Sequence, residues 1–340
     1  MTTPATMRAA VLLGPRRLVV RERPTPRPGP YDVLVRLIAV GLCGSDVHFY
    51  EHGRVGDLVV DEPLVLGHEA AGEIVAVGSA VDESRIGERV AVEPQRPCRR
   101  CRYCLTGAYN LCRSMEFCSA PPVDGAFAEY LVVPADFAYP VPGTMSDAAA
   151  ALLEPLSVGI AAVRKARVRP GSAVLVAGAG PIGVLTAAAA RAHGASVVVA
   201  SDPLAARRAV AAVHGATRVI DPLEQRLEEE SVDAFVDASG APAAIDAGLR
   251  ALRAGGTAVL VGMGSPRVDL DLFLVQSREL RLEGLFRYVD TWPTAIALAE
   301  SDPADLDALV TGSVGLDGLD EAMRRNGDAD VVKFIVDPRR

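Results

Sequence analysis

A short apolar run leads directly into a glycine-rich turn at 173–183, AVLVAGAGPIG. Glycine at 178 permits a tight turn, glycine at 180 lets the backbone approach a pyrophosphate, and glycine at 183 lets a helix pack close to the strand. An alanine-rich helical pattern follows, so the strand, turn and helix of a dinucleotide-binding loop are all present. A plain strand-to-helix corner is the alternative reading of these glycines.

Asp202 follows the next strand-like segment, SVVVAS, about 20 residues after the turn. A carboxylate at this place accepts hydrogen bonds from the adenine ribose hydroxyls and repels a 2′-phosphate. The pattern therefore favours NAD over NADP. Arg207 and Arg208 lie close by in the sequence, and a nearby arginine could accommodate the phosphate, so NADP stays open.

The alternation of strand-like and helix-like segments continues through the second half of the chain. Short apolar runs at 173–178, 196–201, 217–220, 233–239, 257–263 and 280–286 alternate with helix-like segments. Such βαβ units have right-handed connections and build a doubly wound parallel sheet with helices on both faces. A helix is expected near 292–300 and a last strand at 331–336, in a tail that we expect to pack back on the first domain.

The first half of the chain has a different pattern of predicted secondary structure. From about 8 to 150, short valine-rich runs alternate with proline and glycine, which predicts a mostly β domain, and a helical pattern at 147–165 leads out of it. A chain of 340 residues suggests two domains. We expect a catalytic domain at 1–155 with a metal lobe at about 93–113, a coenzyme domain at 156–287, and the returning segment at 288–340.

Charge and hydropathy exclude several classes of partner. The net charge of -8 argues against nucleic acid and against an anionic membrane surface, which leaves small molecules as ligands. Residues 171–190 carry no charge, but glycine and proline divide them, so a membrane span is not expected. The N-terminal segment does not resemble a secretory signal, and we expect a cytoplasmic location.

Four of the six cysteines form a compact series at 98–112. The spacing C-x2-C-x2-C-x7-C supplies four thiolates, enough to close a tetrahedral Zn²⁺ site with no position left for chemistry. We expect Cys98, Cys101, Cys104 and Cys112 to hold a structural zinc. An iron–sulfur cluster is the alternative, although the fourth cysteine comes late for that spacing and no proline follows it.

Cys43 lies 55 residues before that series and needs other partners. His68 and Glu69 offer an imidazole and a carboxylate side by side, and Glu154 places a carboxylate in an otherwise apolar helical segment. A buried carboxylate is costly unless it is paired or bound to a metal. A mixed thiolate, imidazole and carboxylate set with one open position is what a catalytic zinc requires.

Five segments together resemble the sorbitol and xylitol dehydrogenase branch of the zinc-dependent medium-chain dehydrogenases. They are 43–72, 116–125 (EFCSAPPVDG), 152–160 (LLEPLSVGI), 177–183 and 284–293 (GLFRYVDTWP). The resemblance is collinear from about residue 8 to the end of the sequence. It implies a GroES-like β-barrel domain plus a Rossmann domain, with the active site in the cleft between them, and it suggests a tetramer.

The resemblance also implies roles for single residues. Cys43, His68 and Glu69 would bind the catalytic zinc, with Glu154 holding or replacing its water. Arg287 and Tyr288 would contact substrate hydroxyls, and Phe117 would line the pocket. The residues expected to contact NAD are Gly178, Gly180, Pro181, Ile182, Gly183, Asp202, Arg207, Val261, Gly262, Met263, Leu285, Phe286 and Arg287.

One departure concerns the substrate. Animal members of this branch have tyrosine where this chain has Phe49, so a polar contact to the polyol is lost or is transferred to Tyr50. The four cysteines, which those animal enzymes lack, make the chain more similar to microbial polyol dehydrogenases. Both Phe49 and Tyr50 are therefore expected at the substrate.

The expected reaction is oxidation of a secondary hydroxyl of a polyol to a ketose, with hydride passing to NAD and with Ser45 and His48 relaying the proton. His52 is expected to have no role. A 2,3-butanediol or threonine dehydrogenase is the alternative within this chemistry. A catalytically silent binding protein and a zinc-free quinone reductase are disfavoured by the intact set of ligands.

Overall fold

The computed structural model describes residues 3–301 and 304–340, which form two compact units. The first unit runs to Glu154 and takes up the chain again at Leu306–Arg340, and the second is Pro155–Asp305. The sequence placed the return at 288. In the structure the second unit extends to Asp305, and within it Arg164 donates to the carbonyl of Asp290 at 2.7 Å and to Oγ1 of Thr294 at 2.9 Å.

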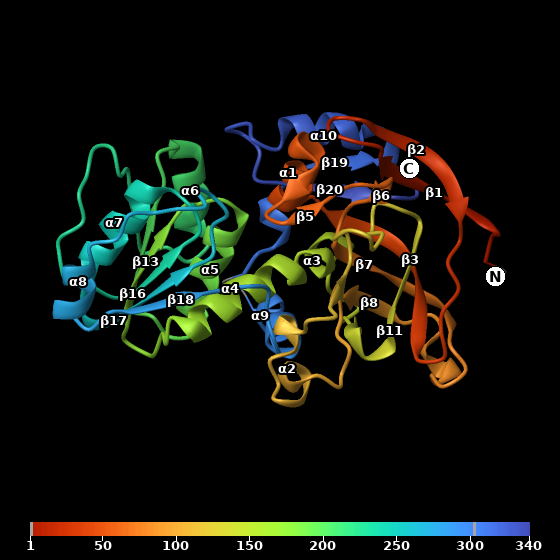
Figure 1. The fold of residues 1–340 in the computed structure, drawn as a ribbon, viewed down its shortest axis with the longest axis horizontal. Coiled ribbons are helices and arrows are strands. Elements are labelled where there is room, and N and C mark those ends of the chain that lie inside the picture. The colour runs from red at the N-terminus through yellow and green to blue at the C-terminus, as the bar shows by residue number, and fades with distance from the viewer. Residues whose placement is uncertain (1–2, 302–303) are drawn as a thin grey trace. The chain divides into compact units, whose positions relative to one another are not determined.

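The first unit is built on a seven-stranded sheet (Figure 1). The order is β12-β8-β7-β3-β20-β19, and β11 pairs with β3. All pairs are antiparallel except β19 with β20. The strands are β3 (Asp32–Gly41), β7 (Glu69–Val77), β8 (Arg89–Val92), β11 (Tyr130–Pro134), β12 (Ala138–Pro140), β19 (Val310–Gly315) and β20 (Lys333–Asp337).

Smaller elements complete this unit. A second sheet has the order β2-β1-β6, and two short hairpins pair β4 with β5 and β9 with β10. These strands are β1 (Thr6–Leu12), β2 (Leu18–Pro24), β4 (Arg54–Val55), β5 (Leu58–Val59), β6 (Leu64–Val65), β9 (Gln95–Arg96) and β10 (Glu116–Phe117). The α-helices are α1 (Gly44–His52), α2 (Arg102–Leu105), α3 (Asp147–Ala151) and α10 (Leu319–Arg325).

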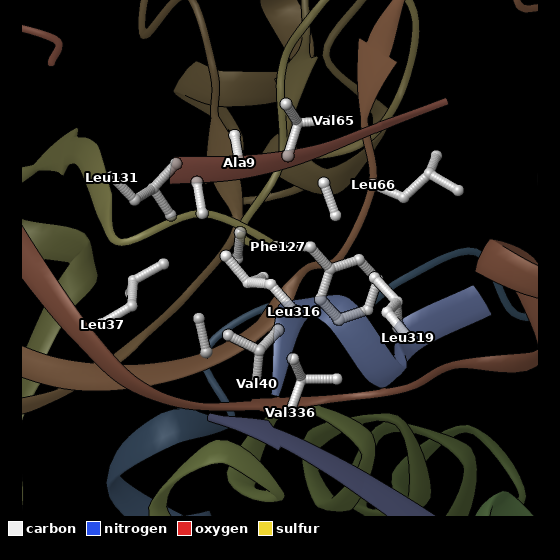
Figure 2. Close-up of a cluster of buried hydrophobic side chains, with 14 of the residues drawn as sticks. Ala9, Leu37, Val40, Val65, Leu66, Phe127, Leu131, Leu316, Leu319 and Val336 are labelled. Atoms are coloured by element: carbon white, nitrogen blue, oxygen red, sulfur yellow. The ribbon is translucent and has the colours of Figure 1, made fainter. Parts of the chain in front are cut away.

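The returning segment is part of the core of the first unit. Figure 2 shows Leu316, Leu319 and Val336 among the side chains that surround Phe127, and all of them are at most 1% exposed. Full burial of an aliphatic side chain stabilises a fold by roughly 1.5–3 kcal/mol. The return is therefore held by packing as well as by the hydrogen bonds between β20 and β3.

The second unit contains a parallel six-stranded sheet in the order β15-β14-β13-β16-β17-β18. Helix α5 packs on β13, β14 and α6, helix α6 packs on β14 and β15, and α7 packs on β13, β16 and β17 (Figure 1). The strands are β13 (Ala173–Ala177), β14 (Val197–Ser201), β15 (Arg218–Ile220), β16 (Val232–Asp237), β17 (Leu252–Leu260) and β18 (Arg281–Gly284).

This strand order is that of a doubly wound dinucleotide-binding domain, which confirms the predicted fold class. Each of the six expected strands is present, although β17 begins five residues before the expected 257. The helices are α4 (Leu153–Lys165), which begins at the unit boundary, α5 (Pro181–Ala192), α6 (Ala205–Val213), α7 (Pro242–Ala251), α8 (Leu272–Ser277) and α9 (Trp292–Ala299). In the described part of the chain, no helix has the length and hydropathy to cross a membrane.

Candidate metal and nucleotide sites

Cys43 lies where β3 ends and α1 begins. Its backbone N–H donates to Oδ2 of Asp46 at 3.1 Å, and Oδ1 of the same carboxylate accepts from the N–H of Gly67 at 3.0 Å. Asp46 is fully buried. One carboxylate thus joins the turn that carries Cys43 to the loop that carries His68.

His68 is buried, and its Nδ1 has polar partners. Ser119 Oγ lies 3.0 Å from Nδ1, and Oδ1 of Asp46 lies 3.5 Å from it. Burial lowers the pKa of His68, but the Asp46 carboxylate and the Cys43 thiolate outweigh burial and raise this pKa well above its ordinary value. Nε2 is then the nitrogen left to act as a ligand.

Glu69 begins β7 and is 1% exposed. The ammonium of Lys333 donates to its Oε1 at 2.6 Å and lies 2.6 Å from its Oε2. Among the described residues, Oε2 makes no hydrogen bond. Burial lowers the pKa of Lys333, but Glu69, Cys43 and Glu154 raise it above its ordinary value, so its side chain stays an ammonium.

The ligand atoms of Cys43, His68 and Glu69 all lie within 4.8 Å of one another. A thiolate, an imidazole and a carboxylate are a ligand set that suits Zn²⁺. Glu154, the fourth expected ligand, is buried at the first turn of α4 but is not part of this group of three.

The four-cysteine lobe also has the spacing of a metal site. The Sγ atoms are 3.5 Å apart for Cys101 and Cys104, 3.9 Å for Cys101 and Cys112, and 4.0 Å for Cys98 and Cys104. A tetrahedron of sulfurs about 2.3 Å from a central ion has edges of about 3.8 Å. All six cysteines are free, and these distances far exceed a disulfide bond of about 2.05 Å.

The pKa values of two thiols in the four-cysteine lobe are lowered, which favours the thiolate form that binds metal. A backbone N–H bond from Cys104 lowers the pKa of Cys101 to about 6, and those from Arg100 and Cys101 lower the pKa of Cys98. Burial instead raises the pKa of Cys104 to about 12. The backbone therefore favours two of the thiolates before a metal arrives.

Other expected residues lie on α1, where they separate into two groups. Phe49 is 4% exposed in the hydrophobic core, and the hydroxyl of Tyr50 donates to Oδ1 of Asp320 at 2.8 Å. The interior of the unit therefore holds both side chains. Ser45 is half-buried and His48 is exposed, with the ring of His48 5.9 Å from that of His52.

The other expected substrate contacts come from both units. In the first unit, the ring of Phe117 lies 5.5 Å from that of His68. In the second unit, Arg287 has a φ of 60° and places its guanidinium 4.5 Å from the centre of the Phe286 ring. Tyr288 is 1% exposed, with its ring 6.3 Å from that of Trp292 in an edge-on arrangement.

The glycine-rich turn has the close packing that its sequence predicts. Gly178 has a φ of 91°, and a Cβ at Gly183 would lie 1.8 Å from the carbonyl oxygen of Gly178. Around Gly180, which precedes α5, no atom of the described residues lies within 4 Å of an added Cβ. The turn therefore needs glycine at 178 and 183 for the fold and leaves open space at 180.

Asp202 follows β14 and is 4% exposed. Its Oδ2 accepts from the N–H of Ala179 and its Oδ1 from that of Leu204, each at 2.8 Å. Arg208 is engaged by the carbonyl of Asp202 at 2.6 Å and by the carboxylate of Asp221 at 2.9 Å. Arg207 makes no side-chain hydrogen bond or ion pair within the described ranges.

The remaining expected coenzyme contacts lie after β17 and β18. The N–H groups of Val261 and Gly262 both donate to the carbonyl of Asp237 at 2.9 Å. Met263 and Phe286 are more than half exposed, and Leu285 is half-buried. These residues follow the carboxyl ends of parallel strands, where ligands bind in open sheets of this class.

Comparison with known families assigns both halves of the chain. Residues 29–143 match the alcohol dehydrogenase GroES-like domain, and residues 181–301 match the zinc-binding dehydrogenase domain. The chain belongs to the zinc-dependent medium-chain dehydrogenases. This confirms the resemblance, the two-domain fold class and the assignment as an oxidoreductase.

Relatives of this dehydrogenase align along its whole length. It is 39% identical to the sorbitol dehydrogenase of Bacillus subtilis, over 100% of this chain and 99% of the relative. It is 40% identical to D-xylulose reductase A of Aspergillus niger, over 96% and 95% of the two chains. A zinc-binding dehydrogenase structure from Sinorhizobium meliloti, bound to NADP, has a TM-score of 0.91 at 31% identity and covers 98% of this chain and 100% of its own.

Three residues of this dehydrogenase were not recognised from its sequence. Asp46, Ser119 and Lys333 contact the group formed by Cys43, His68 and Glu69. Lys333 offered one signal, because it is one of only two lysines in the chain and lies in an apolar strand pattern, VVKFIV. Ser119 and Asp46 offered only their proximity to Phe117 and Cys43.

Proposed function

We propose that this dehydrogenase oxidises a secondary hydroxyl of a polyol such as sorbitol or xylitol to the corresponding ketose, with NAD⁺ as the acceptor. The carbinol C–H bond breaks with its electron pair passing to the nicotinamide, and the hydroxyl proton is released, so that NADH, H⁺ and a ketone are formed. The observation that carries this proposal is the group Cys43, His68 and Glu69 in a chain that aligns end to end with a sorbitol dehydrogenase.

Two zinc ions per chain are proposed. Cys43, His68 and Glu69, with Glu154, would hold the catalytic ion, and the four cysteines Cys98, Cys101, Cys104 and Cys112 would hold the structural one. A zinc ion with an open position supplies a Lewis acid that lowers the pKa of a coordinated hydroxyl. The closed set of four thiolates leaves no such position and fits a structural role.

The chain's own residues supply orientation and a route for the proton. Ser119 and Asp46 fix the ring of His68 through Nδ1. Ser45 and His48 are three residues apart on α1 and therefore share a face, with His48 at the surface. We propose that they pass the substrate proton to solvent, while Phe117, Arg287 and Tyr288 shape the substrate site.

NAD is the proposed coenzyme. Both oxygens of Asp202 keep a lone pair beyond the backbone N–H that each accepts, so the carboxylate can still receive ribose hydroxyls. Arg208 is engaged elsewhere, which leaves Arg207 as the side chain that could meet a 2′-phosphate. The S. meliloti structure holds NADP, so both coenzymes belong in the test.

The test is reduction of NAD⁺ and NADP⁺ with xylitol, sorbitol, arabinitol, ribitol, galactitol and 2,3-butanediol, before and after chelation. We expect turnover of at least one polyol with NAD⁺, lost on chelation and regained with Zn²⁺. Absence of activity on every polyol, with metal content verified, would refute the proposed substrate class.

A cytoplasmic tetramer is the proposed setting. Six free cysteines fit a reducing compartment. The tetramer rests on the resemblance to polyol dehydrogenases. Light scattering coupled to size exclusion would show about four times the 35.6 kDa chain mass, and a monomer would contradict it.

A further inference from the structure

Glu69 and Lys333 lie on opposite sides of the end of β3. In the sheet, Gly41 pairs with Glu69 of β7 on one edge and with Ile335 of β20 on the other. Lys333 is two residues before Ile335 and begins β20. The two charged side chains therefore belong to strands that are not neighbours, and they meet across the strand that leads to Cys43.

Gly41 makes this meeting possible. A Cβ built on Gly41 would lie 1.9 Å from Oε2 of Glu69 and 3.1 Å from its Cδ. Any larger residue at 41 would thus displace the carboxylate. The absence of a side chain at this one position gives Glu69 the space to reach Lys333.

Burial of the Lys333 ammonium beside Glu69 costs hydration free energy. Lys333 is 2% exposed, and among the described residues the hydrogen bond of its ammonium goes to Glu69 alone. A buried ammonium loses several kcal/mol of hydration, which a well-formed ion pair must offset. The pair therefore constrains both side chains, because the ammonium lies 2.6 Å from Oε1, to which it donates, and 2.6 Å from Oε2.

Charge counting adds a second reason for the lysine. The proposed catalytic set contains one thiolate and two carboxylates, so with a divalent cation its net charge would be negative. The single positive charge of Lys333 offsets part of this negative charge, to which the buried Asp46 carboxylate adds. Burial of a balanced set costs less free energy than burial of an unbalanced one.

We propose that Lys333 is a positioning residue of the catalytic metal site: it holds the Glu69 carboxylate across Gly41, in place for the ion beside Cys43 and His68. This inference rests on the proposed zinc site. It assigns to the returning C-terminal segment a part in building that site, in addition to its part in the core.

The experiment compares Co²⁺-substituted wild type with Lys333→Met and Lys333→Arg. Chelator competition gives the affinity of each site, and the visible spectrum of Co²⁺ reports its ligand geometry. For Lys333→Met we expect affinity at the Cys43 site to fall 10- to 100-fold with an altered spectrum. The four-cysteine site should keep its affinity and serves as an internal control. Lys333→Arg restores the cation and should recover part of the loss.

Gly41→Ala is the second variant, and it keeps both charges. It should reproduce the affinity loss because the new methyl group displaces Oε2, whereas Gly44→Ala, with open space around its Cβ, should not. If Lys333→Met does not fold, Gly41→Ala decides the question.

Wild-type affinity and spectrum in a folded Lys333→Met or Gly41→Ala would overturn the inference. If the wild-type protein binds no ion at the Cys43 site, the proposed function is refuted instead. The failure of the Lys333 inference and the failure of the proposed function therefore give different results.

Discussion

The hydroxyl of Tyr109 donates to Oε1 of Glu93 at 2.9 Å, and this contact ties the four-cysteine lobe to the end of β8. Tyr139 donates to Oε2 at 3.1 Å and Gln95 to Oε1 at 2.9 Å. Glu93 is fully buried, and three neutral donors satisfy it without a cation. Burial raises the pKa of Glu93 to about 7, although the three hydrogen bonds lower it.

Glu93 should make the stability of the protein depend on pH. Its pKa is raised in the folded state, so its contribution is complete below about pH 4.5 and is lost as pH rises to about 7. Glu93→Gln removes this titration and keeps the shape. Unfolding in denaturant at pH 5 and pH 8, with zinc present, should show wild type losing about 2–3 kcal/mol relative to Glu93→Gln. A constant difference between the two proteins would contradict this assignment.

Two glycines of the nucleotide turn should separate folding from coenzyme binding. Gly183→Ala puts a methyl group 1.8 Å from the Gly178 carbonyl oxygen and should lower the melting temperature. Gly180→Ala meets no protein atom, so the apoprotein should melt as wild type does, while the Kd for NADH rises at least tenfold because backbone can no longer approach the pyrophosphate. Calorimetry and NADH fluorescence titration give the two quantities. Unchanged NADH affinity in Gly180→Ala would remove this turn from the coenzyme site.

The sequence predicted the second unit well because its strands are buried on both faces and therefore appear as continuous apolar runs. The glycine turn was predicted equally well, since Gly178 has a positive φ and Gly183 lies against the carbonyl oxygen of Gly178. The role of Lys333 could not be predicted from the local sequence. Its partner Glu69 is 264 residues away, and the pair depends on β3 lying between β7 and β20, a register that no local pattern encodes.

Phe49 and Tyr50 show how a helix places neighbouring residues on one buried face. Their position after Cys43 suggested a substrate contact, but on a helix they share a face with Asp46 at spacings of three and four residues. All three are buried. The helical period alone indicates this shared buried face from the sequence.

Asp202 should set the choice of coenzyme. Asp202→Asn keeps one acceptor oxygen for the turn but loses the negative charge, so the Kd for NAD⁺ should rise about tenfold and discrimination against NADP⁺ should weaken. Asp221→Asn is the matched control, because it removes a nearby carboxylate that pairs with Arg208. Coenzyme titrations of both variants check this. An effect of equal size in Asp221→Asn would mean that general charge, and not a ribose contact, determines the preference.

Tyr50 should matter for stability and not for substrate. Tyr50→Phe removes the hydrogen bond to Asp320 and the one accepted from Arg324 at 3.2 Å, which should cost about 1 kcal/mol in the free energy of unfolding. The KM for the polyol should not change, because the hydroxyl is engaged by α10. Phe117→Ala is the comparison, since its ring faces that of His68 at 5.5 Å, and there we expect KM to rise with little loss of stability. A raised KM for the polyol in a stably folded Tyr50→Phe would contradict this prediction. It would show that the Tyr50 hydroxyl contacts substrate in addition to α10.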